Sequence, residues 1–326
     1  MRRRDFITLL SGTVAAWPVA ARTQQQAVPV VGYLSGGTPD AGARLIAAFR
    51  KALDEAGFVE GRSVTLEYRF ANDEIGRLPE LAADLVRRRV GVILASGVDA
   101  ARAAQAATRT IPIVFRAGSD PIEANLVASL NRPGGNVTGI NDMGAVLGAK
   151  RLGLLHDMLP RATRFAVLVD PNSTVADRYI EDARAAAAAI GLQIEVFDAG
   201  TNGEIDSAFA AILQKHNDAL LVSSDVIFFT RRVQVVTLAT RHAVPTLYSY
   251  REAAEIGGLM SYGTSLTDAS RLAGFYTARI LKGEKPADLP VMRSTKFEFV
   301  INLQTARTLR IDVPPTLLAT ADEVIE

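Results

Sequence analysis

The feature that most constrains the fold is a pattern of residues that occurs twice along the chain. In each half, short apolar runs alternate with longer stretches whose apolar residues recur at helical spacing. The first run of each half reads VPVVGYL or RFAVLVD, and the third reads GVILAS or ALLVSS. Gly57 matches Gly191 and Gly134 matches Gly257, at offsets of 134 and 123 residues. This offset predicts a duplicated domain, because solenoid repeats have periods of about 20 to 50 residues.

Each half has the order β-α-β-α-β-α-β, which fixes the expected fold class. Right-handed crossovers turn such a unit into a parallel sheet with helices on both faces. The sequence therefore predicts an α/β protein with two Rossmann-like lobes, and a ligand site outside the carboxyl ends of their strands. Two alternatives remain open at this point, namely one continuous Rossmann-like sheet and two unconnected domains.

The last part of the chain does not fit the duplication and suggests how the lobes are joined. Residues 266–281 have the pattern of a helix, and residues 296–303 read as a strand. A chain that returns after completing the second lobe can cross between the lobes again, and several crossings make a hinge. The expected division is 28–140 plus about 263–292 for lobe 1, and 141–262 plus about 293–326 for lobe 2.

Small and polar residues follow the predicted strands of both halves. Many of them precede helices, whose free N–H groups favour a carboxylate, while the aspartates suit an amine and the tyrosines offer aromatic walls. Each polar residue could instead be an ordinary helix cap. The candidate ligand-binding residues are Ser35, Gly36, Ser96, Gly97, Asp120, Asn172, Ser173, Ser224, Asp225, Tyr248 and Tyr262.

Signals of catalysis are poor. His156, His216 and His242 lie on separate helical stretches without an acidic or cysteine cluster at ligand spacing. The chain has no GxSxG elbow, no phosphate-binding Walker loop and no dinucleotide fingerprint. We therefore expect no catalytic residue, no metal site and no cofactor. An exported α/β enzyme, such as a hydrolase or dehydrogenase, is the alternative.

The N-terminus predicts a twin-arginine-type export signal over residues 1–26. Arg3 and Arg4 precede a short apolar stretch that is too short and too weakly apolar to span a bilayer. Small residues follow, so cleavage is expected near residues 20–23, with release into the periplasm. Alternatives are a disordered basic tail and an amphipathic anchor.

Composition adds little to the list of partners. Removal of the signal takes away four arginines and one aspartate and moves the net charge from +1 to about −2. That balance suggests neither nucleic acid nor a membrane surface as partner. The chain has no cysteine, and a mature chain of about 300 residues can bury a large core without disulfides.

Several long stretches resemble a known family. They include AFRKALDEAGFVEGRSVTLEYRFA, KRLGLLHDMLPRATRFAVLVDPNS, HAVPTLYSYREAAEIGGLMSYG and, most specifically, SDPIEANLVASLNRPGGNVTG. The chain resembles the substrate-binding proteins of ABC importers, in the group related to tryptophan and other aromatic amino acid binding proteins. The resemblance covers nearly the whole mature chain.

The resemblance implies a type I periplasmic binding protein fold that captures a small ligand by hinge closure. The ligand would be an amino acid or an aromatic or carboxylated compound, and the partner an ABC permease in the inner membrane. Arg116 follows the fourth strand, and an anionic ligand becomes favoured if its side chain faces the cleft. We expect a monomer. A solute-presenting partner of a membrane receptor stays open, whereas a repressor-type regulator would need a DNA-binding N-terminus where the signal stands.

Overall fold

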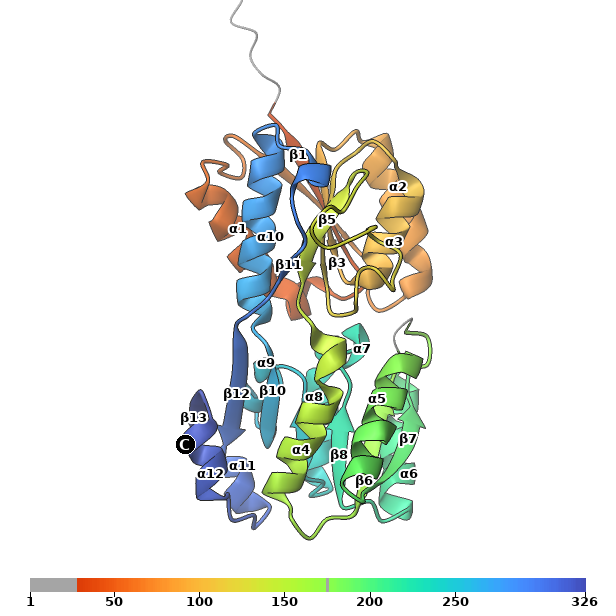
Figure 1. Cartoon of the computed structure of the whole chain (residues 1–326), viewed down its shortest axis with the longest axis vertical. Coiled ribbons are helices and arrows are strands. Elements are labelled where there is room, and N and C mark those ends of the chain that lie inside the picture. The colour runs from red at the N-terminus through yellow and green to blue at the C-terminus, as the bar shows by residue number, and fades with distance from the viewer. Residues whose placement is uncertain (1–27, 174–175) are drawn as a thin grey trace, which may run out of the picture.

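The computed structural model describes residues 28–173 and 176–326 and shows two lobes stacked along the long axis of the molecule (Figure 1). Each lobe contains its own sheet, so the alternative of one continuous sheet is wrong. The α/β fold class with two mostly parallel sheets is confirmed. The predicted export signal lies outside the described residues.

Lobe 1 is built on a six-stranded sheet, the upper one in Figure 1. Its strand order is β11-β5-β4-β3-β1-β2, and all pairs are parallel. The central strands are buried on both faces and consist of near-continuous apolar runs, as the sequence predicts. The strands are β1 (Val30–Ser35), β2 (Thr65–Phe70), β3 (Val92–Ser96), β4 (Ile113–Ala117), β5 (Val137–Asn141) and β11 (Met292–Arg293).

Helices cover both faces of this sheet. Apolar side chains of α2 and α3 form one core with the sheet, and those of α1 and α10 form another on the opposite face. Gly57 takes a positive φ of 95° just after α1, and Gly191 takes 71° at the matching place after α5. The helices are α1 (Pro39–Glu55), η1 (Ile75–Arg77), α2 (Leu78–Arg87), α3 (Val98–Ala107), α10 (Leu266–Leu281) and η3 (Pro286–Asp288).

Lobe 2 repeats the plan and extends it. Its seven-stranded sheet has the order β13-β12-β10-β9-β8-β6-β7, in which β12 alone pairs antiparallel, with β10. The strands are β6 (Arg164–Val169), β7 (Gln193–Asp198), β8 (Ala219–Val222), β9 (Thr246–Tyr248), β10 (Met260–Thr264), β12 (Phe297–Asn302) and β13 (Glu323–Ile325).

The helices of lobe 2 also divide between the two faces of their sheet. One core contains side chains of α4, α5, α11 and α12, and the other contains side chains of α6, α7, α8 and α9. The helices are η2 (Gly144–Leu147), α4 (Gly148–Met158), α5 (Ala176–Ala189), α6 (Asn202–Gln214), α7 (Val226–Thr230), α8 (Arg232–Arg241), α9 (Arg251–Glu255), α11 (Leu303–Thr308) and α12 (Pro315–Thr320).

Three chain segments connect the lobes: residues 141–144, 264–266 and 293–297 (Figure 1). They are hydrogen-bonded to one another. The N–H of Ser294 donates to the Asn141 carbonyl at 2.9 Å, the N–H of Ser265 donates to the Lys296 carbonyl at 2.9 Å, and the Thr264 hydroxyl donates to the Asp142 carbonyl. The connection is therefore a small bonded unit and not three independent strands.

Arg151 on α4 reinforces this junction from inside lobe 2. Its side chain is fully buried and donates to the carbonyl oxygens of Gly144 at 2.9 Å and Tyr262 at 2.8 Å. Gly144 is the last residue of the first connecting segment, and Tyr262 lies just before the second. A guanidinium with five N–H donors can join them because its geometry is fixed and planar.

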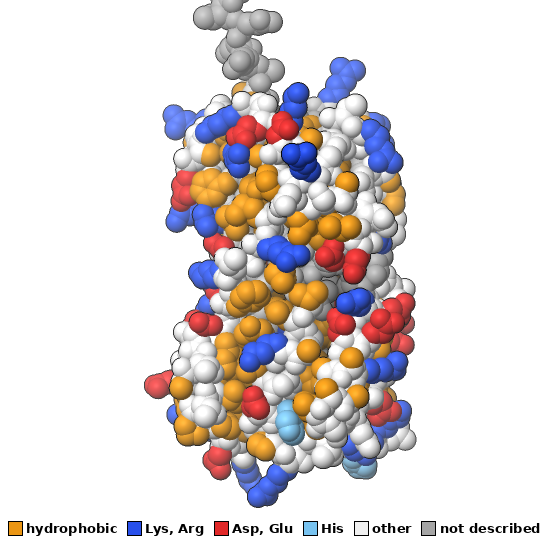
Figure 2. All heavy atoms as spheres, in the orientation of Figure 1, with side chains coloured by type: hydrophobic (Ala, Val, Ile, Leu, Met, Phe, Trp, Pro, Cys, Tyr) orange, Lys and Arg blue, Asp and Glu red, His pale blue; other side chains and the backbone are white. Residues whose placement is uncertain are grey.

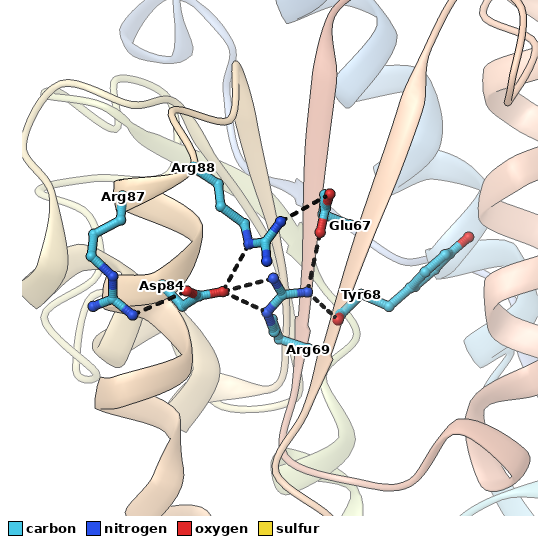
Figure 3. A network of polar contacts seen from close by, with 6 residues as sticks. All are labelled: Glu67, Tyr68, Arg69, Asp84, Arg87 and Arg88. Atoms are coloured by element: carbon cyan, nitrogen blue, oxygen red, sulfur yellow. Dashed lines mark hydrogen bonds and ion pairs between the residues drawn. The ribbon is translucent and has the colours of Figure 1, made fainter.

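Charged side chains of both signs are spread over the face seen in Figure 2, without one large patch of a single sign. A local network lies at the edge of lobe 1, where Asp84 on α2 pairs with Arg69 on β2 at 2.6 Å and with Arg87 and Arg88 (Figure 3). No helix within residues 28–173 and 176–326 combines the length and the apolar character that crossing a membrane requires.

Candidate ligand-binding site

A cavity lies between the lobes, at the carboxyl ends of their strands. The space open to the centre of a water molecule amounts to about 100 Å³. The residues that line it from lobe 1 and its connection are Tyr33, Ser35, Gly37, Thr38, Ala41, Gly42, Leu45, Ser96, Gly97, Val98, Asp99, Arg116, Ala117, Gly118, Ser119, Asp142 and Leu266. Those from lobe 2 are Ser173, Ser224, Asp225, Val226, Phe229, Thr230 and Tyr250.

In lobe 1, tight turns at the ends of β1 and β3 bring backbone and hydroxyl groups to the cavity. The Ser35 hydroxyl oxygen accepts from the N–H of Gly37 at 3.2 Å, and the Thr38 hydroxyl caps α1. Gly97 precedes α3 with a φ of 105°, which L side chains rarely adopt. The β1 and β3 loops therefore approach the cavity mainly through backbone and small side chains.

Arg116 at the end of β4 connects three strand ends. One terminal nitrogen, Nη1, lies 3.2 Å from Oδ2 of Asp142, and the other, Nη2, donates to the Ser96 hydroxyl at 2.7 Å. The side chains of Arg116 and Asp142 are 12% and 3% exposed, so the ion pair is largely removed from water. Burial raises the pKa of the Asp142 carboxyl, whereas the Arg116 guanidinium and the N–H of Gly144 act in the opposite direction.

Two further groups of lobe 1 lie in this polar corner. The Ser119 residue is 6% exposed, and its hydroxyl has no hydrogen-bond partner among the described residues. The ring of Tyr33 is buried, and burial raises the pKa of its hydroxyl. A buried hydroxyl that lacks a partner is costly and indicates that a polar group of a ligand or water completes the site.

Lobe 2 contributes an acidic group and an aromatic wall. Oδ2 of Asp225 accepts from the Ser223 hydroxyl at 2.5 Å and from the N–H of Asp170 at 3.1 Å. The rings of Phe229 and Tyr250 meet edge to face, with centroids 5.7 Å apart. This wall can pack against a flat apolar group, while Asp225 offers a carboxylate at the same cavity.

The lobes touch each other around the cavity. An added methyl group at Gly37 would lie 3.1 Å from the Thr230 hydroxyl oxygen, so α7 of lobe 2 closely approaches the β1 loop. Arg231 pairs with Asp73 at 3.0 Å, and Arg44 pairs with Glu255 at 3.0 Å. Both ion pairs join lobe 1 to lobe 2. The two lobes therefore contact each other at several points around the cavity.

Six of the candidate residues predicted from sequence line the same cavity. They come from four loops, two in each lobe. The duplicated sequence pattern predicts that these loops follow matching strands of the two lobes. The six residues are Ser35, Ser96, Gly97, Ser173, Ser224 and Asp225.

The other five candidate residues do not line this cavity. Gly36 faces Ile75, since a methyl group added to Gly36 would lie 2.8 Å from Cδ1 of Ile75. The Asp120 carboxylate accepts from the N–H groups of Ile122 and Glu123, and therefore orders its own exposed turn. The local alternative of a cap describes Asp120 better.

The remaining three of these five are turned elsewhere by their surroundings. The Asn172 amide lies 3.2 Å from Oδ1 of Asp170 and borders a smaller neighbouring cavity. Tyr248 is buried in the core of lobe 2, and Tyr262 stacks on Phe297 with centroids 6.2 Å apart. Both tyrosines lie within strands, and their rings pack against the hydrophobic cores of lobe 2 instead of facing the cavity.

Sequence reasoning missed Asp142, Phe229 and Thr230 as cavity residues. Asp142 directly follows β5 and could have been found by extending the strand-end rule to the fifth strand. Phe229 and Thr230 lie on the short helix α7, whose sequence VIFFT reads as an ordinary apolar run. Within the described part of the chain, no group of three or more His, Cys, Asp or Glu residues is arranged to hold a metal ion.

Comparisons with known proteins agree with this architecture. A family model described as "ABC transporter substrate binding protein" matches residues 27–325. The chain is 26% identical over 261 residues to the tyrosine-binding protein of Clostridioides difficile strain R20291. The matched region covers 80% of this chain and 75% of that protein.

Solved structures give the same picture. An ABC domain in complex with L-Trp from Streptococcus pneumoniae has a TM-score of 0.83 and 26% identity, covering 91% of this chain and 99% of that one. A conserved domain protein from Vibrio cholerae has a TM-score of 0.85 and 26% identity with the same coverage. The fold is that of the type I periplasmic binding proteins, and the resemblance seen in the sequence is confirmed. The chain belongs to the ABC transporter substrate-binding protein family.

Proposed function

We propose that this protein is the solute-binding component of an ABC importer and that it captures an aromatic amino acid by closure of its two lobes. The observation that carries the proposal is the cavity enclosed by polar loops of both lobes. A ligand held there would contact both halves at once and would therefore favour the closed arrangement through contacts that an open one lacks.

The ligand class rests on the lining and on two relatives. Phe229 and Tyr250 form an aromatic wall, while Arg116 and Asp225 supply charges of opposite sign. The curated relative is a tyrosine-binding protein, and the Streptococcus pneumoniae structure contains L-Trp. These observations support a ligand with an aromatic side chain and a charged head group. Its contacts would include Ser35, Ser96, Gly97, Ser173, Ser224 and Asp225.

Closure would occur about the three connecting segments. Their mutual hydrogen bonds keep the segments together while the lobes rotate, and Arg151 holds the lobe 2 side of the junction. The ion pairs Arg231–Asp73 and Arg44–Glu255 would form on closing. The exposed Arg44–Glu255 pair is worth about 0 to 1 kcal/mol. The Asp73 side chain is only 9% exposed, so the cost of removing its charge from water offsets much of its attraction to Arg231. The ligand therefore has to supply most of the closing energy.

We further propose binding without chemistry, export through the predicted signal over residues 1–26, and delivery to a permease in the inner membrane by a monomer. Family membership supports the delivery step, and the three histidines give no catalytic arrangement in the sequence. A monomer leaves both lobes free for closure and docking.

Isothermal calorimetry with the twenty amino acids tests the proposal directly. We expect L-tyrosine or L-tryptophan to bind with a Kd at or below about 1 μM, the range of about −8 kcal/mol or stronger. Mass spectrometry of small molecules released on denaturation of the purified protein provides an independent check. Failure of every aromatic amino acid to bind, together with release of a ligand from another chemical class, contradicts the proposed ligand.

A further inference from the structure

We propose that Arg116 and Ser119 hold the carboxylate of the ligand, and that Asp142 limits this subsite to ligands that carry an ammonium group as well. This inference rests on the proposed function and names the head-group chemistry of that same site. It assigns Arg116 as a residue that determines specificity. On this proposal, Arg116 at the cavity favours a ligand that carries both charges over a purely anionic one.

The guanidinium of Arg116 has a fixed position. Arg116 is held at the cavity wall by Asp142 at 3.2 Å and by the Ser96 hydroxyl at 2.7 Å. A guanidinium carries five N–H donors, and these two contacts use two of them. The side chain retains 12% exposure at the cavity it lines. A carboxylate entering the cavity therefore meets preorganised donors whose side-chain entropy has already been lost.

A hydroxyl with no partner in the described part of the chain lines the same cavity as this ion pair. Ser119 follows β4 three residues after Arg116, lines the same cavity and is 6% exposed. Its oxygen has no partner within the described residues. Ser119 can donate one hydrogen bond to a carboxylate that also accepts from Arg116, and a bound carboxylate would then satisfy the orphaned hydroxyl.

The charge balance of the cavity also bears on the ligand. Asp142 compensates the guanidinium, and Asp99 of lobe 1 and Asp225 of lobe 2 add further carboxylates to the lining. A ligand with a carboxylate alone would leave the closed cavity with excess negative charge, which is costly to remove from water. A ligand with both charges can place its carboxylate on Arg116 and its ammonium near Asp225. A zwitterion therefore uses the donors of Arg116 without adding net negative charge to the cavity.

Calorimetry with three related probes tests the inference. The probes are L-tyrosine, tyramine without the carboxylate, and 3-(4-hydroxyphenyl)propionate without the ammonium group; the tryptophan series is used if that amino acid binds more tightly. We expect the unaltered protein to bind the amino acid roughly 10- to 100-fold more tightly than either analogue, as the loss of a charged hydrogen-bonding group implies.

The decisive variant is Arg116→Gln combined with Asp142→Asn, which removes both charges and so leaves no buried ion without its partner. We expect it to lose most of the preference for L-tyrosine over tyramine while tyramine binding changes little. Ser119→Ala, which leaves the charged pair in place, should weaken L-tyrosine binding several-fold and spare tyramine. Arg109→Gln, at an exposed arginine of the same lobe, is the matched control and should change none of the affinities.

The outcomes separate this inference from the proposed function. If L-tyrosine binds and the double variant keeps the full preference over tyramine, the carboxylate is held elsewhere and only the inference falls. Equally tight binding of the propionate analogue by the unaltered protein would also overturn the inference alone. If neither aromatic amino acid binds, both the proposed ligand and this subsite are wrong.

Discussion

The two lobes share one backbone plan but differ in the side chains at matching strand ends. Both sheets contain the strand order 2-1-3-4-5, as β2-β1-β3-β4-β5 in lobe 1 and β7-β6-β8-β9-β10 in lobe 2. Through the offset between Pro112 and Pro245, Arg116 corresponds to Ser249. Ser249 is buried and donates to the Val222 carbonyl at 3.0 Å, so lobe 2 has a neutral hydrogen bond where lobe 1 has a buried ion pair.

The duplicated architecture thus fixes which strand ends meet at the cavity but leaves the chemistry of their side chains free to diverge. Lobe 1 presents a rigid charged corner between strand ends. Lobe 2 presents α7, a five-residue helix that contacts the loops of lobe 1. Lobe 1 thus contributes a fixed ion pair, whereas lobe 2 contributes the covering helix together with the Asp225 carboxylate. This division can be tested on each lobe separately.

The largest expected effect is on the stability of the charged corner. Arg116→Ala leaves Asp142 buried without its counter-ion and should lower the free energy of unfolding by about 3 kcal/mol. Ser249→Ala, the matching change in lobe 2, removes one neutral hydrogen bond and should cost about 1 kcal/mol. Urea unfolding measures both. Asp142→Asn in the Arg116→Ala background should restore part of the loss, and equal costs for the two single variants would break the comparison.

A second experiment addresses the contact between the lobes. Gly37→Val places a branched side chain where even a methyl group would lie 3.1 Å from the Thr230 hydroxyl oxygen. We expect ligand affinity to fall at least about tenfold, a loss of about 1.4 kcal/mol of closing energy, with the unfolding midpoint little changed. Small-angle scattering should show a more open molecule.

The control for that experiment is Gly153→Ala on α4, where an added methyl group meets no atom within 4 Å. This change should leave affinity unchanged and stabilise the helix by up to about 1 kcal/mol. Unaltered binding by Gly37→Val would mean that the lobes do not approach each other as closely in solution as they do here.

The smallest expected effect concerns carboxylates near the outer strands of the two sheets. As at the cavity, the charge pairing is stronger in lobe 1 than in lobe 2. Three arginines, with Arg69 the strongest contributor, lower the pKa of Asp84 to about 2 (Figure 3). Lys215 alone among cations bonds to Glu195 on the edge strand of lobe 2 and lowers its pKa. A depressed carboxyl pKa contributes stability above the unfolded value of about 3.9 for Asp, and that contribution is lost as the pH falls toward 2.

Asp84→Asn should therefore lower the urea midpoint at pH 6, and the difference from the unaltered protein should shrink between pH 4 and pH 2. Glu195→Gln should show the same trend with a smaller amplitude, since fewer cations surround it. A difference for Asp84→Asn that stays constant over this pH range would show that packing and not charge accounts for its effect.

The sequence was sufficient to predict the α/β class and the presence of two sheets. The buried strands are apolar runs, and Gly57 and Gly191 end helices at positive φ in both halves. Six of the eleven candidate site residues line one cavity, because parallel strands end at one edge of a sheet and bring the residues that follow them together. The predicted signal and the exact lobe boundaries stay predictions.

The remaining parts of the site could not be predicted because they depend on side-chain directions. Asp120 and Ser119 are neighbours in sequence, yet the carboxylate turns back to its own loop while the hydroxyl faces the cavity. Tyr248 and Tyr250 are two residues apart, and only Tyr250 lines the cavity. Regular alternation would place both on the same face of a strand. The strand ends at Tyr248, and the loop that follows turns Tyr250 to the cavity.

The repeated order of elements follows from local signals, because apolar periodicity and helix-ending glycines act over a few neighbouring residues. The pairing of Arg116 with Asp142, 26 residues away, and the approach of α7 of lobe 2 to the loops of lobe 1 appear only in the folded molecule. Both depend on long-range packing, which brings together residues that are far apart in the chain. No local pattern in the chain records which of several aspartates will meet a given arginine.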